Sequence, residues 1–169
     1  LLAVGFIIGL HTAVVVVLGG VLGWLILMPA YGLLTLSFFT GLSQEAGPAL
    51  FRWFGWMGIA AAMADAVENQ LLFSITRNLA DPAREMALLP FPVWVKFGLL
   101  AVSCAGAAWG FARLQRWGLA ALCLPAPLLI LPAWLAPYTI GPIATLTIGL
   151  GWLAMGIHAG SRLLQKRQH

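Results

Sequence analysis

Long apolar runs with few charged residues recur along this chain and restrict what it can fold into more than any other feature. The first covers about residues 3–28, and it is followed by runs at about 50–75, 91–111, 117–136 and 140–163. Each run is close to the ~20 residues with which an α-helix crosses the hydrocarbon core of a bilayer. The runs predict an all-α fold: a polytopic helical membrane protein in which residues 1–169 form one membrane domain, a compact bundle of about five transmembrane helices.

The composition excludes the usual soluble classes. Hydrophobic residues make up 62% of the chain and charged residues 8%, whereas soluble domains are about 45–50% apolar and about 25% charged. A soluble fold of this length could not bury so much apolar surface. The nine lysines and arginines are spread along the sequence, so a nucleic-acid-binding face is excluded as well. The lipid bilayer is therefore the partner that the composition predicts.

The segment between the first two runs is harder to assign. Residues 30–47, "AYGLLTLSFFTGLSQEAG", are too apolar for an ordinary loop and too often interrupted by glycine for a clean helix. They predict an interfacial or re-entrant segment that does not cross the bilayer. In the fourth run, Pro125, Pro127 and Pro132 predict a kink. Only "LAPYTIG" separates the last two runs, which leaves a tight turn and one broken membrane element both open.

Basic residues near the span ends predict the orientation. One side of the five-span arrangement holds Arg52, Arg113, Arg116, Arg162, Lys166 and Arg167, and the other holds Arg77 and Arg84. Because cytoplasmic loops are enriched in lysine and arginine, this bias places the C-terminus in the cytoplasm. Aromatic residues agree, since they form one group near each face: Trp24, Trp53, Trp56, Trp109 and Trp117 against Trp94, Trp134 and Tyr138.

A polar cluster interrupts the second run, in "MADAVENQLL" at residues 63–72. Asp65, Glu68 and Asn69 are spaced i, i+3 and i+4, so they share one helical face. An ionised carboxylate that faces hydrocarbon costs several kcal/mol, so this face should look into the bundle. Lys96 lies at a similar depth in the next span, roughly 10 Å from the same membrane face at ~1.5 Å per residue. We therefore predict that Lys96 pairs with Glu68 or Asp65.

Three roles for this cluster remain open on the sequence alone. It could be a structural ion pair that fixes the register of two helices. It could be a polar site for a ligand, a lipid headgroup or a proton. It could also contact another subunit.

Small residues at four-residue spacing predict close helix packing. Such stripes let helix backbones approach each other in lipid, either within one bundle or between subunits. The predicted packing residues are Gly58, Ala62, Ala66, Gly106, Gly110, Gly156 and Gly160.

Two histidines in the apolar runs raise the question of a haem or a chlorophyll-type pigment. His11 and His158 differ in depth by an offset on the order of 10 Å, which is too large for one shared bis-histidine haem. Single axial ligation stays open beside the simpler role of a hydrogen-bonded core residue. Cys104 and Cys123 are predicted to be small core residues. The sequence predicts no metal site and contains no nucleophile motif or phosphate loop, so we expect no catalytic residues and no enzyme activity.

The stretch "ADAVENQLLF" followed by "PVWVKFGLL" resembles small uncharacterised bacterial multi-pass membrane proteins, which carry D-x-x-E-N on one span and K-F on the next. The resemblance covers about residues 50–110. It implies a bundle of four to five helices and the bacterial inner membrane, and it implies no activity.

Taken together, the features predict a non-catalytic integral membrane protein, an accessory or structural subunit of a larger, energy-transducing membrane complex. The alternative is a small carrier, or a bundle that binds a lipid or small molecule, built around Asp65, Glu68, Asn69 and Lys96.

Overall fold

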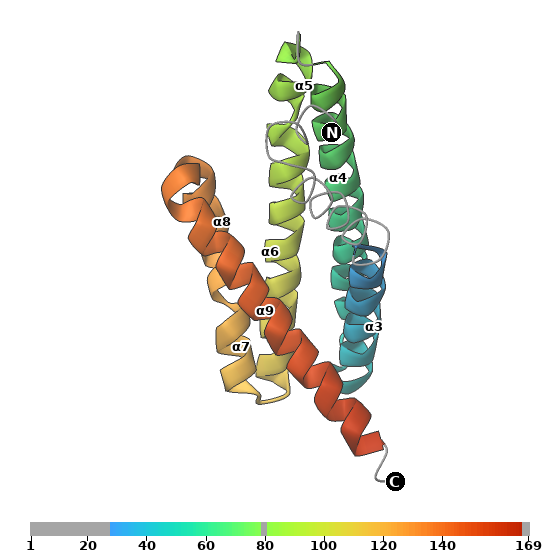
Figure 1. The fold of residues 1–169 in the computed structure, drawn as a ribbon. Coiled ribbons are helices and arrows are strands. Elements are labelled where there is room, and N and C mark those ends of the chain that lie inside the picture. The colour runs from blue at the N-terminus through green and yellow to red at the C-terminus, as the bar shows by residue number, and fades with distance from the viewer. Residues whose placement is uncertain (1–27, 79–80, 167–169) are drawn as a thin grey trace, which may run out of the picture.

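The structure, a computed structural model, describes residues 28–78 and 81–166. Within these residues every regular element is an α-helix (Figure 1). The predicted first span, about 3–28, lies outside the described residues except for Met28. The helices are α3 (Met28–Ala46), α4 (Phe51–Arg77), α5 (Ala83–Leu88), α6 (Pro90–Arg113), α7 (Trp117–Cys123), α8 (Pro125–Leu135) and α9 (Pro137–Lys166).

Three stretches of the described chain are long and apolar enough to cross a membrane: Ala83–Arg113, Trp117–Leu135 and Pro137–Arg162. They correspond to the last three predicted spans and fit a membrane protein. Helix α4, predicted as another span, has 27 residues, or about 40 Å of helix. It is not among the apolar stretches, because Asp65 and its polar neighbours interrupt its apolar run. A bundle of five spans is therefore not confirmed.

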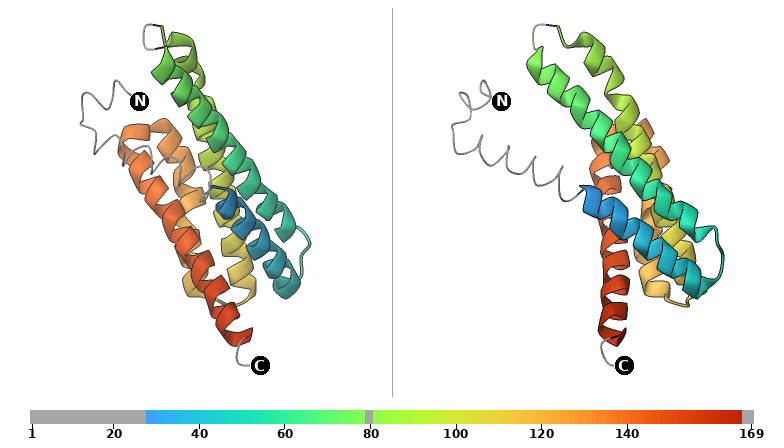
Figure 2. Two further views of the ribbon diagram at one scale, coloured as in Figure 1. Left: turned by 45° about the vertical axis from the view of Figure 1, so that its right-hand side comes forward. Right: turned by 90° about the vertical axis from the view of Figure 1, so that its right-hand side faces the viewer.

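The helices form two adjoining groups. Helices α4 and α6 run antiparallel side by side, and α3 packs along α4 (Figures 1 and 2). Helices α8 and α9 form a second antiparallel pair, and α9 also contacts α6 and α7. We call the end with the α3–α4 and α6–α7 turns and the C-terminal part of α9 the α7 end. The opposite end, with α5, is the α5 end (Figure 1).

The expectation that glycine would prevent a clean helix in residues 30–47 is wrong. Helix α3 runs without a break from Met28 to Ala46. Each internal glycine costs about 1 kcal/mol of helix propensity, but tertiary packing outweighs this cost, because Phe39 and Leu42 are fully buried. The helix ends only at Gly47, whose φ of 96° suits glycine. Helix α3 is not among the three apolar stretches. Length and composition alone do not decide whether a helix enters the bilayer, so the lack of a membrane crossing by α3 stays a prediction.

The prolines interrupt hydrogen bonding more than they change the direction of the chain. Leu89 and Leu124 precede Pro90 and Pro125 and have helical dihedral angles, φ −56° and ψ −39° for Leu89 and φ −67° and ψ −35° for Leu124. Proline has no N–H, so one helical bond is lost at each position. Between α8 and α9 the chain does reverse, at Ala136, whose φ of −134° ends α8. Of the two alternatives for the connection between the last two runs, the structure therefore has the tight turn.

Glycines on α6 and α4 allow close packing, as predicted. A Cβ on Gly106 would collide with the Phe54 ring, and one on Gly110 would collide with Leu42. A Cβ on Gly58 would lie 2.7 Å from Thr35. These contacts join α3, α4 and α6 into one core.

The four other predicted packing residues are less buried. The buried stripe of α4 passes through Ala61 and Ala64, which leaves Ala62 and Ala66 only half-buried. No described atom lies within 4 Å of a Cβ built on Gly156 or Gly160. Of the two alternatives for this pair, packing inside the bundle is therefore not seen among the described residues, and packing against another subunit stays a prediction.

Exposed aromatic side chains gather at both ends of the bundle. Near the α7 end these are Trp53, Trp56, Trp109 and Trp117, and near the α5 end they are Trp134 and Tyr138. Amphipathic rings at two levels are typical of the two membrane–water interfaces.

Candidate functional site: a buried polar cluster between α4 and α6

The structure brings together the four residues of the predicted polar cluster. Asp65, Glu68 and Asn69 lie on the face of α4 that meets α6, about two to three turns before α4 ends. Lys96 lies about two turns into α6. Because the two helices are antiparallel and joined through the short α5 segment, these positions reach the same level.

Lys96 holds both carboxylates. Its Nζ donates to Oδ1 of Asp65 at 2.9 Å, and it also donates to Oε2 of Glu68. Nδ2 of Asn69 donates to Oδ2 of Asp65 at 2.9 Å and to the Asp65 carbonyl oxygen at 2.8 Å. Asn69 therefore fixes the carboxylate of Asp65 on α4, and Lys96 ties it to α6.

The cluster is mostly withdrawn from the surface. The side chains of Asp65, Lys96 and Glu68 are 10%, 14% and 18% exposed. Two carboxylates and one ammonium leave one net negative charge when all three groups are ionised. Among the side chains that the structure describes, which end at Arg162, no other basic group forms an ion pair with either carboxylate. The arrangement can therefore accept a proton or one further small cationic group.

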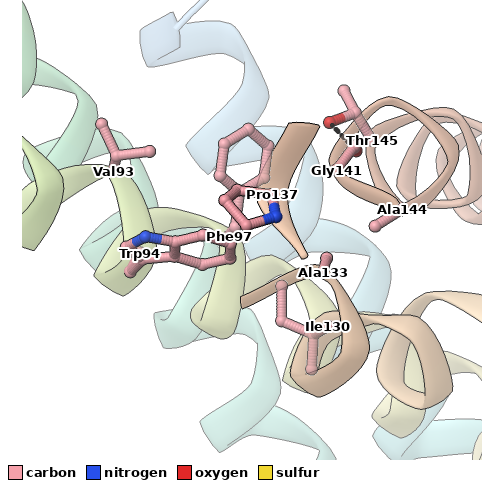
Figure 3. A pocket seen from close by; sticks show the side chains of 9 residues that line it. All are labelled: Val93, Trp94, Phe97, Ile130, Ala133, Pro137, Gly141, Ala144 and Thr145. Carbon is pink, nitrogen blue, oxygen red and sulfur yellow. Dashed lines mark hydrogen bonds between the residues drawn. The ribbon is translucent and has the colours of Figure 1, made fainter. Parts of the chain in front are cut away.

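An apolar pocket lies on the other side of α6 from this cluster. It has a volume of about 180 Å³ and is formed by α6, α8 and α9 (Figure 3). Phe97 lines the pocket, and its ring centroid lies 5.1 Å from Nζ of Lys96, a cation–π distance. Phe97 therefore contacts both the pocket and the ammonium group of Lys96. The lining residues are Val93, Trp94, Phe97, Ile130, Ala133, Pro137, Gly141, Ala144 and Thr145.

A second polar group, which the sequence did not predict, surrounds His158 at the α7 end. Nδ1 of His158 lies 3.0 Å from Nη1 of Arg116. A guanidinium only donates, so Nδ1 must accept and the imidazole carries its proton on Nε2. This Nε2 lies 3.6 Å from Oε2 of Glu45, and Glu45 forms an ion pair with Arg162. The only sequence signal was the count of basic residues near the span ends, which says nothing about mutual contact.

The surroundings of His158 do not fit an axial haem ligand. The residue is 2% exposed, and its ring centroid lies 5.2 Å from that of Phe111 and 5.8 Å from that of Phe38. One ring nitrogen faces Arg116 and the other faces Glu45, so neither is directed at a space for a porphyrin. The second predicted ligand, His11, lies outside the described residues. Among the residues that are described, no three histidine, cysteine, aspartate or glutamate side chains could hold a metal ion.

The two cysteines lie in the core. Cys104 and Cys123 are both free thiols and fully buried. Sγ of Cys123 donates a weak hydrogen bond to the Gly151 carbonyl oxygen at 3.7 Å, and a Cβ on Gly151 would lie 2.7 Å from Sγ of Cys104. The cysteines therefore help α9 to approach α6 and α7.

No protein-family model, no curated protein and no solved structure matches this chain. The resemblance of residues 50–110 to bacterial multi-pass proteins thus stays an expectation that these comparisons do not test. Fold and site define the described part of the chain as a helical bundle with three candidate membrane-spanning helices and a buried ion-pair cluster.

Proposed function

We propose that the protein is a non-catalytic integral membrane protein of the bacterial inner membrane, an accessory or structural subunit that packs in a larger, energy-transducing complex. The observation that carries this proposal is the position of the charged and the apolar side chains. Lys96 joins α4 to α6 inside the bundle, while large apolar side chains cover the outward faces of α4, α6, α8 and α9. Such a bundle offers apolar surface to lipid and to neighbouring subunits.

The proposed topology has five spans with a cytoplasmic C-terminus: the three apolar stretches, α4, and residues 3–28. An α4 span is supported because its carboxylates face α6 rather than the outside. The orientation is supported by charge. The described part of the α7 end holds four arginines and one glutamate: Arg52, Arg113, Arg116, Arg162 and Glu45. At the α5 end, Arg77 and Arg84 are balanced by Asp81 and Glu85.

Purification of the full chain from native membranes in mild detergent, followed by mass spectrometry, tests the subunit role. We expect other integral membrane subunits to co-purify in fixed stoichiometry. Extraction as an isolated monomer, across several mild detergents, would contradict the proposal. The double replacement Gly156→Leu with Gly160→Leu is a useful variant, because it changes an outward face of α9 without any described internal contact. It should release partners while the chain stays folded.

The second candidate, a carrier or small-molecule-binding bundle, is favoured by one observation. The cluster has one carboxylate more than Lys96 neutralises, and Phe97 connects it to an apolar pocket. The substitution Glu68→Gln removes the surplus charge and keeps the side-chain shape. A purely structural cluster should tolerate it, whereas a binding site for a proton or a cationic molecule should lose its ligand. Mass spectrometry of the isolated chain for a retained small molecule, in parent and variant, separates these outcomes.

A further inference from the structure

Three arginines from three segments lie at the α7 end, where they are linked through Ala46, His158 and Glu45. Nε of Arg113, the last residue of α6, donates to the Ala46 carbonyl oxygen at 3.1 Å. The next residue back, Glu45, pairs with Arg162 of α9 and faces His158. His158 in turn accepts from Arg116 in the α6–α7 turn. We call Arg113, Arg116 and Arg162, with Glu45 and His158, the arginine cluster.

The arginine cluster carries a surplus of positive charge. The cluster contains three guanidiniums and one carboxylate, of which only Arg162 pairs directly with Glu45, and His158 is neutral because its Nδ1 accepts from Arg116. The sum is two net positive charges, which deprotonation cannot relieve, since arginine stays charged in proteins. The cluster is buried at His158 and open to the surface at its other members. The side chain of His158 is 2% exposed, whereas those of Glu45 and Arg162 are 25% and 34% exposed. An anion at the surface can therefore reach Arg162 and the exposed Arg113.

The backbone of the α6–α7 turn holds Arg116 in place. Gln115 has a φ of 56°, the left-handed conformation that closes a helix. The Arg116 N–H bonds to the Phe111 carbonyl at 2.8 Å, and the Gln115 N–H bonds to the Ala112 carbonyl at 3.0 Å. This pair of bonds is the Schellman motif, so Arg116 is presented by a defined turn and not by a loose loop.

We propose that the arginine cluster binds the phosphate of an anionic phospholipid headgroup. Arginine binds phosphate through paired N–H groups, and basic pockets between membrane helices on the cytoplasmic side take anionic headgroups. The level is right as well. Arg113 ends one of the apolar stretches that are long enough to cross a membrane, and Arg116 directly precedes another. The exposed Trp117 ring beside it suits the headgroup region.

This inference rests on two parts of the proposed function, the insertion of the chain into a membrane and the cytoplasmic position of the α7 end, and it holds whether or not the chain has partner subunits. Free phosphate has the same chemistry as the headgroup, so the experiment must separate the two. The full chain in detergent is titrated by native mass spectrometry with phosphatidylglycerol, phosphatidylethanolamine and inorganic phosphate. We expect tighter binding of the anionic lipid than of either other probe.

Charge-removing variants locate the site. Arg113→Gln and Arg116→Gln should each weaken phosphatidylglycerol binding by about tenfold or more, as expected for the loss of charge-assisted hydrogen bonds. The matched control is Arg84→Gln, which removes one exposed arginine at the α5 end and should leave binding unchanged. Arg116→Lys keeps the charge but not the paired N–H groups, and it should weaken binding less than Arg116→Gln.

Three results would overturn the proposal: equal binding of the two lipids, equally tight binding of inorganic phosphate, or an Arg84→Gln effect as large as that of the cluster variants. If Arg116→Gln fails to fold, Arg113→Gln decides, because the Arg113 side chain is exposed. The lipid preference of the unmodified chain tests the proposal without any variant.

Discussion

Lys96→Met tests whether the cluster between α4 and α6 is an ion pair on which the bundle depends. The substitution removes the ammonium that holds Asp65 and Glu68. Both carboxylates are less than one fifth exposed, so solvent replaces little of the lost attraction. Removing one partner of a buried pair costs about 3–5 kcal/mol, because an uncompensated charge remains. Two orphaned carboxylates place the expected loss in the upper part of this range.

The comparison variant combines Lys96→Met with Asp65→Leu and Glu68→Leu. No buried charge is left unpaired, so this triple variant should be much more stable than the single one. Asn69 loses its bond to the Asp65 side chain but keeps the bond to the Asp65 carbonyl, a cost of about 1 kcal/mol. Arg84→Met, at an exposed position of α5, controls for the removal of a cation and should stay within about 0.5 kcal/mol of the parent.

The measurement is reversible unfolding of the purified chain in mixed micelles, followed by far-UV circular dichroism and by size-exclusion profile. A cost of less than about 1 kcal/mol for Lys96→Met, or a triple variant as unstable as the single one, would show that the bundle does not depend on this ion pair. A triple variant that is stable but biologically inactive would instead assign the cluster to the carrier or binding function.

Three further predictions follow from the fold. Gly106→Ala should cost about 1–3 kcal/mol of unfolding free energy, because the new methyl group collides with the Phe54 ring. Gly98→Ala on the same helix meets open space and should be neutral or slightly stabilising. Equal unfolding midpoints of these two variants would contradict the close packing of Gly106 against Phe54. Gln115→Gly should stabilise the chain by about 0.5–1 kcal/mol, since glycine adopts the left-handed conformation without a steric penalty; a destabilised variant in the same unfolding assay would show that the Gln115 side chain makes a compensating contact. A single cysteine placed after Gln165, in a background without the native cysteines, should react with a membrane-impermeant reagent only from the cytoplasmic side; labelling of intact cells from outside would invert the proposed topology.

The local sequence determined the apolar helices after α3 and the buried pairing. Apolar runs, prolines and Gly47 mark where helices begin and end, because these features act on neighbouring residues. The spacing of Asp65, Glu68 and Asn69 fixes their common face through the helical repeat. Their pairing with Lys96 also followed from sequence, since two consecutive antiparallel helices have a register that the short connection sets.

Only the tertiary structure decided what depends on how distant helices meet. Residues 30–46 form a helix because α4 and α6 bury Phe39 and Leu42, and this gain outweighs the cost of the glycines. The arginine cluster joins Glu45 to His158 across more than a hundred residues, a distance at which no periodicity or spacing carries information. The arrangement of the helices also decided which stripes of small residues are covered. Gly106 packs under Phe54, while Gly156 belongs to a stripe of the same spacing and has no described neighbour within 4 Å of its Cβ position. A four-residue spacing makes a face available for packing, and the placement of the other helices determines whether that face is used.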